Sequence, residues 1–523
     1  MRKRLKLLSL IAVLTVIATA CGSDSDDSSD TTRRGATATT SPARIDRNTQ
    51  PTTANNDSPR QRTTTTAGAP GQTTFEDYGL NPFVDPVRDG LSTFAVDVDT
   101  GAYTLMRAWV NDGLLPDPDS VRVEEYVNYF DAGFDPPTQE TFAIYADGGP
   151  TPFFDGRNDV LRIVIQAHEV PERRRQDLNL TFVIDVSGSM KEQGKLDTVK
   201  DSLAVLVEEL DRFDTVSIVS YNTDARVVLD PTPGDEKDDI LDAIDDLRAG
   251  GSTNAEAGLL LGYDLADEAF VRDTVNRVVL LSDGVANVGN TGPEAILDEI
   301  GDRARDGIDL VTIGVGIATY NDVLLEQLAD QGDGWYAYVD TYDEAGRLFQ
   351  DRLTTSLETI ARDMKVQVEF DPDLVEEYRL MGFENRDLDD DDFRDDRVDA
   401  GEVNAGHSVT ALYEVGLARD AYRSDQSFAS VNVRWTNPDS NQVEEIFGDI
   451  SADLLSGRFS RTSPEFQVAA TVAAYAEVLR DSRYVEVDLL DVLDEALELP
   501  RDIEDPAFDE FVGLLEKAVS LGR

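Results

Sequence analysis

The sequence predicts an α/β protein in which a doubly wound, mostly parallel sheet is inserted into a β-rich flanking domain, with α-helical N- and C-terminal regions. Strand-like and amphipathic helical segments alternate between residues 176 and 360. Short apolar strands lie on both sides of that stretch, and helical patterns lie beyond them. Regular alternation of strand and helix is typical of a parallel sheet that is covered by helices on both faces.

The alternating stretch begins with the continuous apolar run 178–184, which ends at Asp185. A run without polar interruption is typical of a strand that is buried on both faces. Further strands are expected at 215–221, 226–229, 277–281, 310–315 and 335–339. Helices are expected at 196–210, 237–247, from 253 onward, 293–304, 321–329 and 344–354.

The flanking segments predict the remaining elements. Helices are expected at 103–110 and 123–130, and strands at 142–145, 160–166, 366–370, 408–415 and 428–435. Ser463 followed by Pro464 is typical of the start of a helix. The patterns divide the chain into a signal peptide (1–20), a disordered linker (21–74), an N-terminal region (75–140), a β-rich domain (141–175 with 364–455), an α/β domain (176–360) and a C-terminal helical region (456–523).

Composition and charge exclude several functions. The 523 residues include 103 acidic and 47 basic ones, which gives a formal net charge of −56. A surface this negative repels phosphate groups, so unaided binding to nucleic acid is excluded. One cysteine, Cys21, and two histidines exclude an intrachain disulfide, zinc sites of the Cys/His kind and Cys–His catalysis in the folded body.

The N-terminus has the pattern of a secretory signal. Basic residues precede an apolar run, 7–18, that is too short to span a bilayer. The run ends in Ala18-Thr19-Ala20-Cys21, which resembles a bacterial lipobox, whose cysteine is acylated, for example with palmitate. We therefore expect an exported protein that is lipid-anchored to the cell membrane and faces the cell exterior or the periplasm. Ordinary signal cleavage with an unmodified thiol is the alternative.

Polar side chains follow the central strands at the edge where ligands bind in such sheets. The set comprises Asp185, Ser187, Ser189, Thr253 and Asp283. Two carboxylates and three hydroxyls form an oxygen-only set that suits Mg²⁺ or Mn²⁺ better than Ca²⁺. Its two negative charges are too few to satisfy the ion fully. The alternative is that these residues, Ser189 and Thr253 above all, cap helices. Because Asp185 ends a strand, we expect it to lie outside the core.

In this order and spacing, the five residues resemble the metal-ion-dependent adhesion site of the von Willebrand factor A domain, whose motif is D-x-S-x-S, then Thr, then Asp. The resemblance implies that the serines and the threonine touch the metal and that the aspartates act largely through water. It also implies that an Asp or Glu carboxylate of a protein partner fills the remaining position on the metal.

Segments outside the α/β domain resemble one bacterial lipoprotein family that contains such domains. Residues 93–103 and 121–130 look like its N-terminal region, and residues 378–386 and 405–414 look like its C-terminal domain of unknown function. That family has no agreed activity, so the resemblance implies an architecture rather than a role.

The function that these patterns favour is a non-enzymatic adhesion or scaffolding module at a membrane surface. The alternatives are an envelope hydrolase with an unrecognised acidic site in the flanks, and an assembly or activation factor for an envelope complex. The segment Asp97-Val98-Asp99-Thr100 mimics a phosphatase motif, but Gly101 stands where that motif needs threonine. Capping of the following helix by Asp99 or Thr100 is the better interpretation.

Replacement of Cys21 by alanine is expected to release the protein from membranes, because acyl chains are the only strong hydrophobic anchor that remains after signal cleavage. Fractionation of cells, followed by immunoblotting of the soluble and membrane fractions, measures the release. Ser23→Ala is the matched control and should stay with the membrane. Membrane retention of Cys21→Ala with its signal still processed would contradict the lipid anchor.

Overall fold

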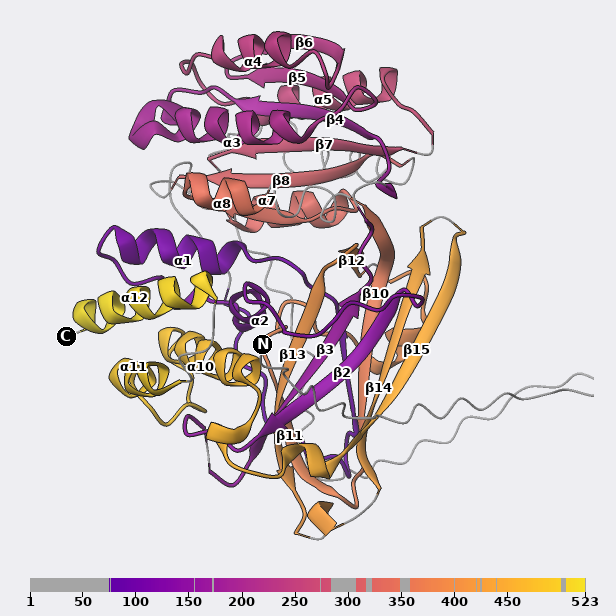
Figure 1. The fold of residues 1–523 in the computed structure, drawn as a ribbon, viewed down its shortest axis with the longest axis vertical. Coiled ribbons are helices and arrows are strands. Elements are labelled where there is room, and N and C mark those ends of the chain that lie inside the picture. Colours follow the sequence, from indigo (N-terminus) through magenta and orange to yellow (C-terminus); the bar gives the residue numbers. More distant parts are fainter. Residues whose placement is uncertain are drawn as a thin grey trace, which may run out of the picture. The chain divides into compact units, whose positions relative to one another are not determined.

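The computed structural model describes residue 75 and residues 77–522, except for 155, 172–173, 273, 284–306, 317–321, 349–357, 399, 420, 424–425, 439 and 500–504. The predicted signal peptide, linker, Cys21 and helix 293–304 lie outside the described residues. None of the helices described is both long enough and apolar enough to cross a membrane. The described part of the chain contains three sheets and the helices that pack on them (Figure 1).

The α/β domain is built on a six-stranded sheet in which five strands are parallel and edge strand β6 is antiparallel. In order across the sheet, the strands are β6 (Ala225–Pro233), β5 (Thr215–Tyr221), β4 (Leu178–Asp185), β7 (Val275–Ser282), β8 (Asp309–Val315) and β9 (Tyr336–Val339). Every residue of β4 is buried, which explains its continuous apolar sequence.

Helices cover both faces of this sheet (Figure 1). One hydrophobic core includes α3 (Lys195–Glu209), α4 (Lys237–Asp245) and α8 (Tyr342–Gly346). A second core includes α5 (Ala255–Glu268) and α7 (Asp322–Gln331). The predicted doubly wound, mostly parallel sheet is therefore confirmed.

Two antiparallel sheets share a further hydrophobic core. One sheet has the order β11 (Val375–Met381), β13 (Ser408–Leu417), β3 (Asp159–Ala167) and β2 (Phe142–Gly149). The other has the order β1 (Leu91–Ala95), β10 (Thr359–Phe370), β14 (Ser427–Asn437) and β15 (Gln442–Ser451), with β12 (Gly401–Asn404) paired to β10.

The register of β3 and β13 places Ile163 opposite Ala411. Strands from before and after the α/β domain thus lie in one sheet. The exact domain boundaries expected from the sequence stay a prediction. Strands β11, β12 and β15 are not predicted from the sequence.

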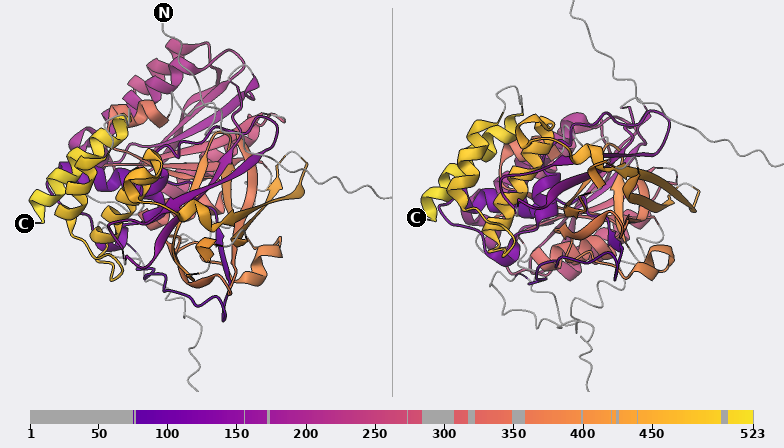
Figure 2. Two further views of the ribbon diagram at one scale, coloured as in Figure 1. Left: turned by 60° about the horizontal axis from the view of Figure 1, so that its bottom comes forward. Right: turned by 90° about the horizontal axis from the view of Figure 1, so that it is seen from below.

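The remaining α-helices lie in the two terminal regions, where helices are predicted, and they share one hydrophobic core. They are α1 (Gly101–Asn111), α2 (Val123–Asn128), α10 (Pro464–Leu479), α11 (Leu489–Glu498) and α12 (Pro506–Leu521). Figure 2 shows α10, α11 and α12 side by side. Ser463 accepts a hydrogen bond from the backbone N–H of Phe466 at 3.1 Å, which confirms the predicted start of α10.

Helix α1 packs against β9, the edge strand of the α/β sheet. A Cβ atom on Gly101 would lie 2.0 Å from the ring of Tyr336, so the helix comes this close only because glycine stands there. Asp99 Oδ1 accepts a hydrogen bond from the Tyr336 backbone N–H at 3.1 Å. Thr100 occupies the N-cap of α1 without a side-chain hydrogen bond, so the predicted capping is wrong. The segment instead attaches the N-terminal region to the sheet.

Arg107 on α1 joins three distant parts of the chain, and its side chain is only 3% exposed. It contacts Asp340 at 2.9 Å and 2.5 Å, Glu344 at 2.9 Å and Glu510 at 3.2 Å. It also donates to the hydroxyl of Tyr129 at 2.6 Å. A buried guanidinium is stable only when its charge is paired and its hydrogen bonds are made, and these acceptors do both.

Replacement of Arg107 by methionine is expected to lower the free energy of unfolding by about 3–5 kcal/mol, because it leaves buried carboxylates without their cation. Urea denaturation of the two proteins measures the difference. The matched control is Arg394→Met, which removes a pair with Glu445 on a side chain that is 63% exposed. That change should cost about 1 kcal/mol or less, and equal losses for the two variants would contradict the prediction.

Candidate functional site

Asp185 ends the central strand β4, and the ends of the neighbouring strands hold its carboxylate. Oδ1 accepts a hydrogen bond from the backbone N–H of Ser187 at 2.7 Å. Oδ2 accepts from Ser282 Oγ at 3.3 Å and from the Tyr221 hydroxyl at 3.4 Å. Asp185 is fully buried, so the expectation that it lies outside the core is wrong. The reason is that residues from β5 and β7 surround its side chain.

Burial and a second carboxylate both act on Asp185. Burial, and then the charge of Asp283, raise the pKa of Asp185 to about 6, while hydrogen bonds from Ser187 and Ser282 oppose the shift. Strands β4 and β7 are parallel neighbours, so the two aspartates that follow them lie at the same edge of the sheet. Two buried carboxylates at one edge favour the binding of a positive group there.

Backbone hydrogen bonds join the two loops that carry the predicted hydroxyls. The N–H of Gly188 donates to the carbonyl of Gly251 at 3.0 Å, and the N–H of Gly250 donates to the carbonyl of Val186 at 2.7 Å. Gly251 has a φ of +95°, and a Cβ atom there would lie 3.0 Å from Thr223 Oγ1. A residue with a side chain would therefore strain this crossing of loops.

The hydroxyls of the predicted set do not cap helices in the described structure. Asn254 caps α5 through its own side chain, and Thr253 stands one residue before it. The short 3₁₀ helix 189–194 has no side-chain hydrogen bond at its N-cap. The Oγ atoms of Ser187 and Ser189 lie 3.0 Å apart. The capping alternative therefore does not account for these residues.

Asp283 directly follows β7 and pairs with Lys195, the first residue of α3. The Nζ atom of Lys195 lies 3.0 Å from Asp283 Oδ2, and both side chains are buried. Sequence reasoning missed Lys195, and it also missed Tyr221 and Ser282. The only signal for Lys195 is its place at the start of the predicted helix, and nothing in the spacing shows that its side chain turns inward.

The five predicted side chains thus lie on three loops at the carboxyl edge of the sheet. Among the residues that the structure describes, no three His, Cys, Asp or Glu side chains group as they would in a metal site made of such residues alone. An ion at this edge would depend on the hydroxyls as well as on the two carboxylates. Oxygen ligands of this kind fit a hard divalent cation such as Mg²⁺ or Mn²⁺.

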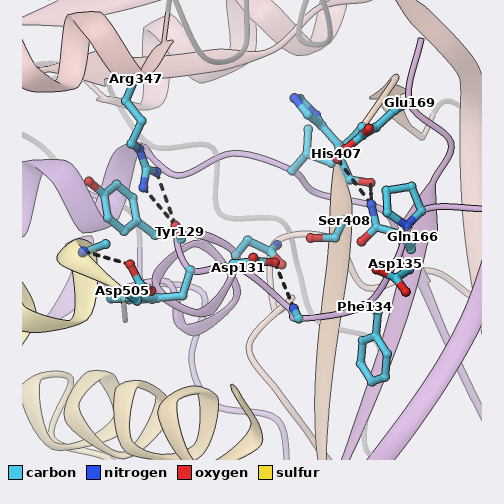
Figure 3. Close-up of a pocket in the computed structure, with 17 residues that line it drawn as sticks. Tyr129, Asp131, Phe134, Asp135, Gln166, Glu169, Arg347, His407, Ser408 and Asp505 are labelled. Atoms are coloured by element: carbon cyan, nitrogen blue, oxygen red, sulfur yellow. Dashed lines mark hydrogen bonds between the residues drawn. The ribbon is translucent and has the colours of Figure 1, made fainter. Parts of the chain in front are cut away.

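A separate cavity of about 550 Å³ contains none of the five predicted residues (Figure 3). Arg347 in its wall donates to the backbone carbonyl of Tyr129 at 3.3 Å. The guanidinium carbon of Arg347 lies 3.6 Å from the centroid of the Tyr129 ring. Gln166 donates to the carbonyls of Gly406 and His407 at 3.4 Å. These polar side chains therefore hold the local backbone together.

A buried carboxyl group, Glu124, lines another cavity, of about 330 Å³. The residue is 2% exposed, and its Oε2 has no hydrogen-bond partner among the described residues. Burial, and then the charges of Glu384 and Asp97, raise the pKa of Glu124 to about 7. A carboxyl group with a raised pKa in a cavity is a feature of many active-site acids. Sequence reasoning did not single out Glu124.

Three family models match successive parts of the chain. The model "von Willebrand factor type A domain" matches residues 179–351, which include all five predicted site residues. The model "von Willebrand factor" matches residues 69–162, and "Uncharacterized protein YfbK, C-terminal" matches residues 355–521.

Known proteins are similar to the chain at two scales. "Uncharacterized protein YfbK" of Escherichia coli (strain K12) is 35% identical over 440 residues, which cover 80% of this chain and 76% of that protein. "Inter-alpha-trypsin inhibitor heavy chain H3" of Homo sapiens is 27% identical over 166 residues, or 30% of this chain and 18% of that protein. A solved structure, "von Willebrand factor type A from Catenulispora acidiphila", aligns with a TM-score of 0.42 at 15% identity and covers 74% of this chain and 91% of that one.

The raised pKa of Glu124 predicts a pH-dependent stability. A carboxyl group whose pKa is higher in the folded protein than in the unfolded one stabilises the fold below about pH 4.5, and this contribution is lost as the pH rises through about 7. Between pH 4.5 and 8, wild type should therefore lose about 2–3 kcal/mol relative to Glu124→Gln. Unfolding in urea at both pH values measures this difference. Exposed Glu376→Gln is the control, and equal pH dependence of all three proteins would contradict the prediction.

Proposed function

Because the chain belongs to the family of Escherichia coli YfbK and carries a von Willebrand factor type A domain, we propose that it is an adhesion or scaffolding module that binds a protein partner through a divalent cation. Domains of this type commonly mediate binding between proteins. The partner would offer an Asp or Glu carboxylate, and nucleic acid is not a partner because of the high negative charge.

The observation that carries the proposal is the set of oxygen-bearing side chains at the carboxyl edge of the sheet, which helix capping does not explain. A Mg²⁺ or Mn²⁺ ion would be held there by Asp185, Ser187, Ser189, Thr253 and Asp283, with Ca²⁺ less suited. When bound, such an ion supplies Lewis acidity toward the partner's carboxylate. The chain's own residues position the loops and keep the two carboxylates buried and close to each other.

Export and a lipid anchor at Cys21 complete the proposal. The linker 21–74 would hold the folded body away from the membrane, outside the cell or in the periplasm. A role as an assembly or activation factor for an envelope complex uses the same site and the same anchor. It differs only in what the captured partner does next.

Glu124 favours a second candidate function, hydrolysis at an acidic site in the flanks. Its raised pKa suits a general acid at neutral pH. The described residues that line its cavity include no serine, cysteine or histidine, so the nucleophile would be an activated water molecule or one of the carboxylates of Asp77, Asp119 and Glu384. The binding function is favoured because it explains five side chains at one edge.

Addition of Mg²⁺ or Mn²⁺ to EDTA-treated protein is expected to raise its melting temperature, because an ion that binds only the folded state stabilises it by about 2.7 kcal/mol at a hundred times its Kd. Asp185→Asn should lose most of the rise, since the amide removes a negative charge but can still accept the hydrogen bond from Ser187. Asp201→Asn, an exposed change on α3, is the control and should keep the rise. Calorimetry that detects no divalent binding by wild type would contradict the metal site.

A further inference from the structure

Lys195 is a buried cation beside the candidate metal ligands. Its side chain is 1% exposed, and its Nζ lies 3.0 Å from Oδ2 of the fully buried Asp283. The N-terminus of a helix carries a partial positive charge, and burial disfavours an ammonium group. Neither the helix nor the core therefore explains a lysine at this position, whereas the pairing with Asp283 does.

Packing fixes the path of this side chain. Gly316 follows β8 with a φ of +85°, and a Cβ atom in its place would lie 2.3 Å from Cε of Lys195. The glycine thus leaves the space through which the lysine runs toward Asp283. As a result, the ammonium group lies at the edge of the sheet that carries the two aspartates.

On the basis of the proposed metal site, we propose that Lys195 sets the charge of that site so that it requires an acidic ligand. The buried charged groups at this edge, the carboxylates of Asp185 and Asp283 and the ammonium group of Lys195, carry a net charge of minus one. A divalent ion changes this charge to plus one, and one carboxylate from a partner brings it to zero.

Without the lysine, the same steps lead from minus two to zero and then to minus one. The ion would bind more tightly, because a like charge nearby is removed, and the acidic ligand would bind more weakly. Lys195 therefore lowers the affinity of the site for the metal and raises the affinity of the metal-bound site for an anionic partner.

The test compares the full-length wild type with Lys195→Gln and Lys200→Gln. Glutamine keeps a donor for Asp283 but removes the charge. Lys200 lies on the same helix, where its Nζ donates to the carbonyl of Asp245 at 2.9 Å, so its replacement removes an equal charge away from the site. Mn²⁺ alone is titrated first by calorimetry. Acetate is then titrated into the Mn²⁺-saturated proteins, and the electron paramagnetic resonance spectrum of the bound Mn²⁺ is followed.

We expect Lys195→Gln to bind Mn²⁺ at least about tenfold more tightly and acetate at least about fivefold more weakly than wild type, and Lys200→Gln to stay within about twofold on both. If Lys195→Gln folds only with metal, the dependence of its melting temperature on Mn²⁺ concentration gives the same constant.

Equal or weaker Mn²⁺ binding by Lys195→Gln, or unchanged acetate binding, overturns the role of Lys195 and leaves the metal site standing. Absence of Mn²⁺ binding in all three proteins overturns the metal site and the role of Lys195 together.

Discussion

One desolvated cation, Arg107, joins the α/β domain to the helices at both ends of the described chain. Its acceptors come from the end of β9, from α8 and from α12, while the arginine itself belongs to α1. Because a buried charge is tolerated only when it is paired, Arg107 requires the buried carboxylates of Asp340 and Glu344, whereas Glu510 on α12 is 44% exposed. Helix α1 then also covers the edge strand β9, which would otherwise present unpaired backbone groups. The strand ends that carry the candidate site are held within that same sheet.

Much of the α/β sheet could be predicted because strands that are buried on both faces, such as β4, have continuous apolar sequences. Strand β11 could not, because Arg379 interrupts its pattern. That arginine is fully buried by ion pairs with Glu414 and Glu477, and periodicity does not reveal burial that depends on pairing. Strand β15 lies at a sheet edge and has exposed residues along its length, so its apolar signal is weak.

The candidate site divides in the same way. Asp185, Ser187, Ser189, Thr253 and Asp283 can be proposed from the sequence because their order along the chain matches strand ends that parallel topology brings to one edge, and their role stays a prediction. Lys195 was missed because its inward direction depends on the space left by Gly316, a residue more than a hundred positions later. The burial of Asp185 was likewise mistaken, because Tyr221 and Ser282 contact it only after three strands have assembled. Local sequence patterns predict which element carries a side chain, whereas tertiary packing determines the direction in which that side chain points.

The insertion of the α/β domain between β3 and β10 imposes an order on folding. Gln166 at the end of β3 contacts the carbonyl of His407, 241 residues further along the chain. During synthesis, strand β3 of the β2–β3 hairpin therefore has one unpaired edge until β13 has been made. Independent folding of the α/β domain would bring the two ends of that domain together. The loop that must close before the two antiparallel sheets can pair would then be shorter. A defect inside the parallel sheet would thus expose a strand edge elsewhere, and the aggregation that follows would begin in residues that the defect never touched.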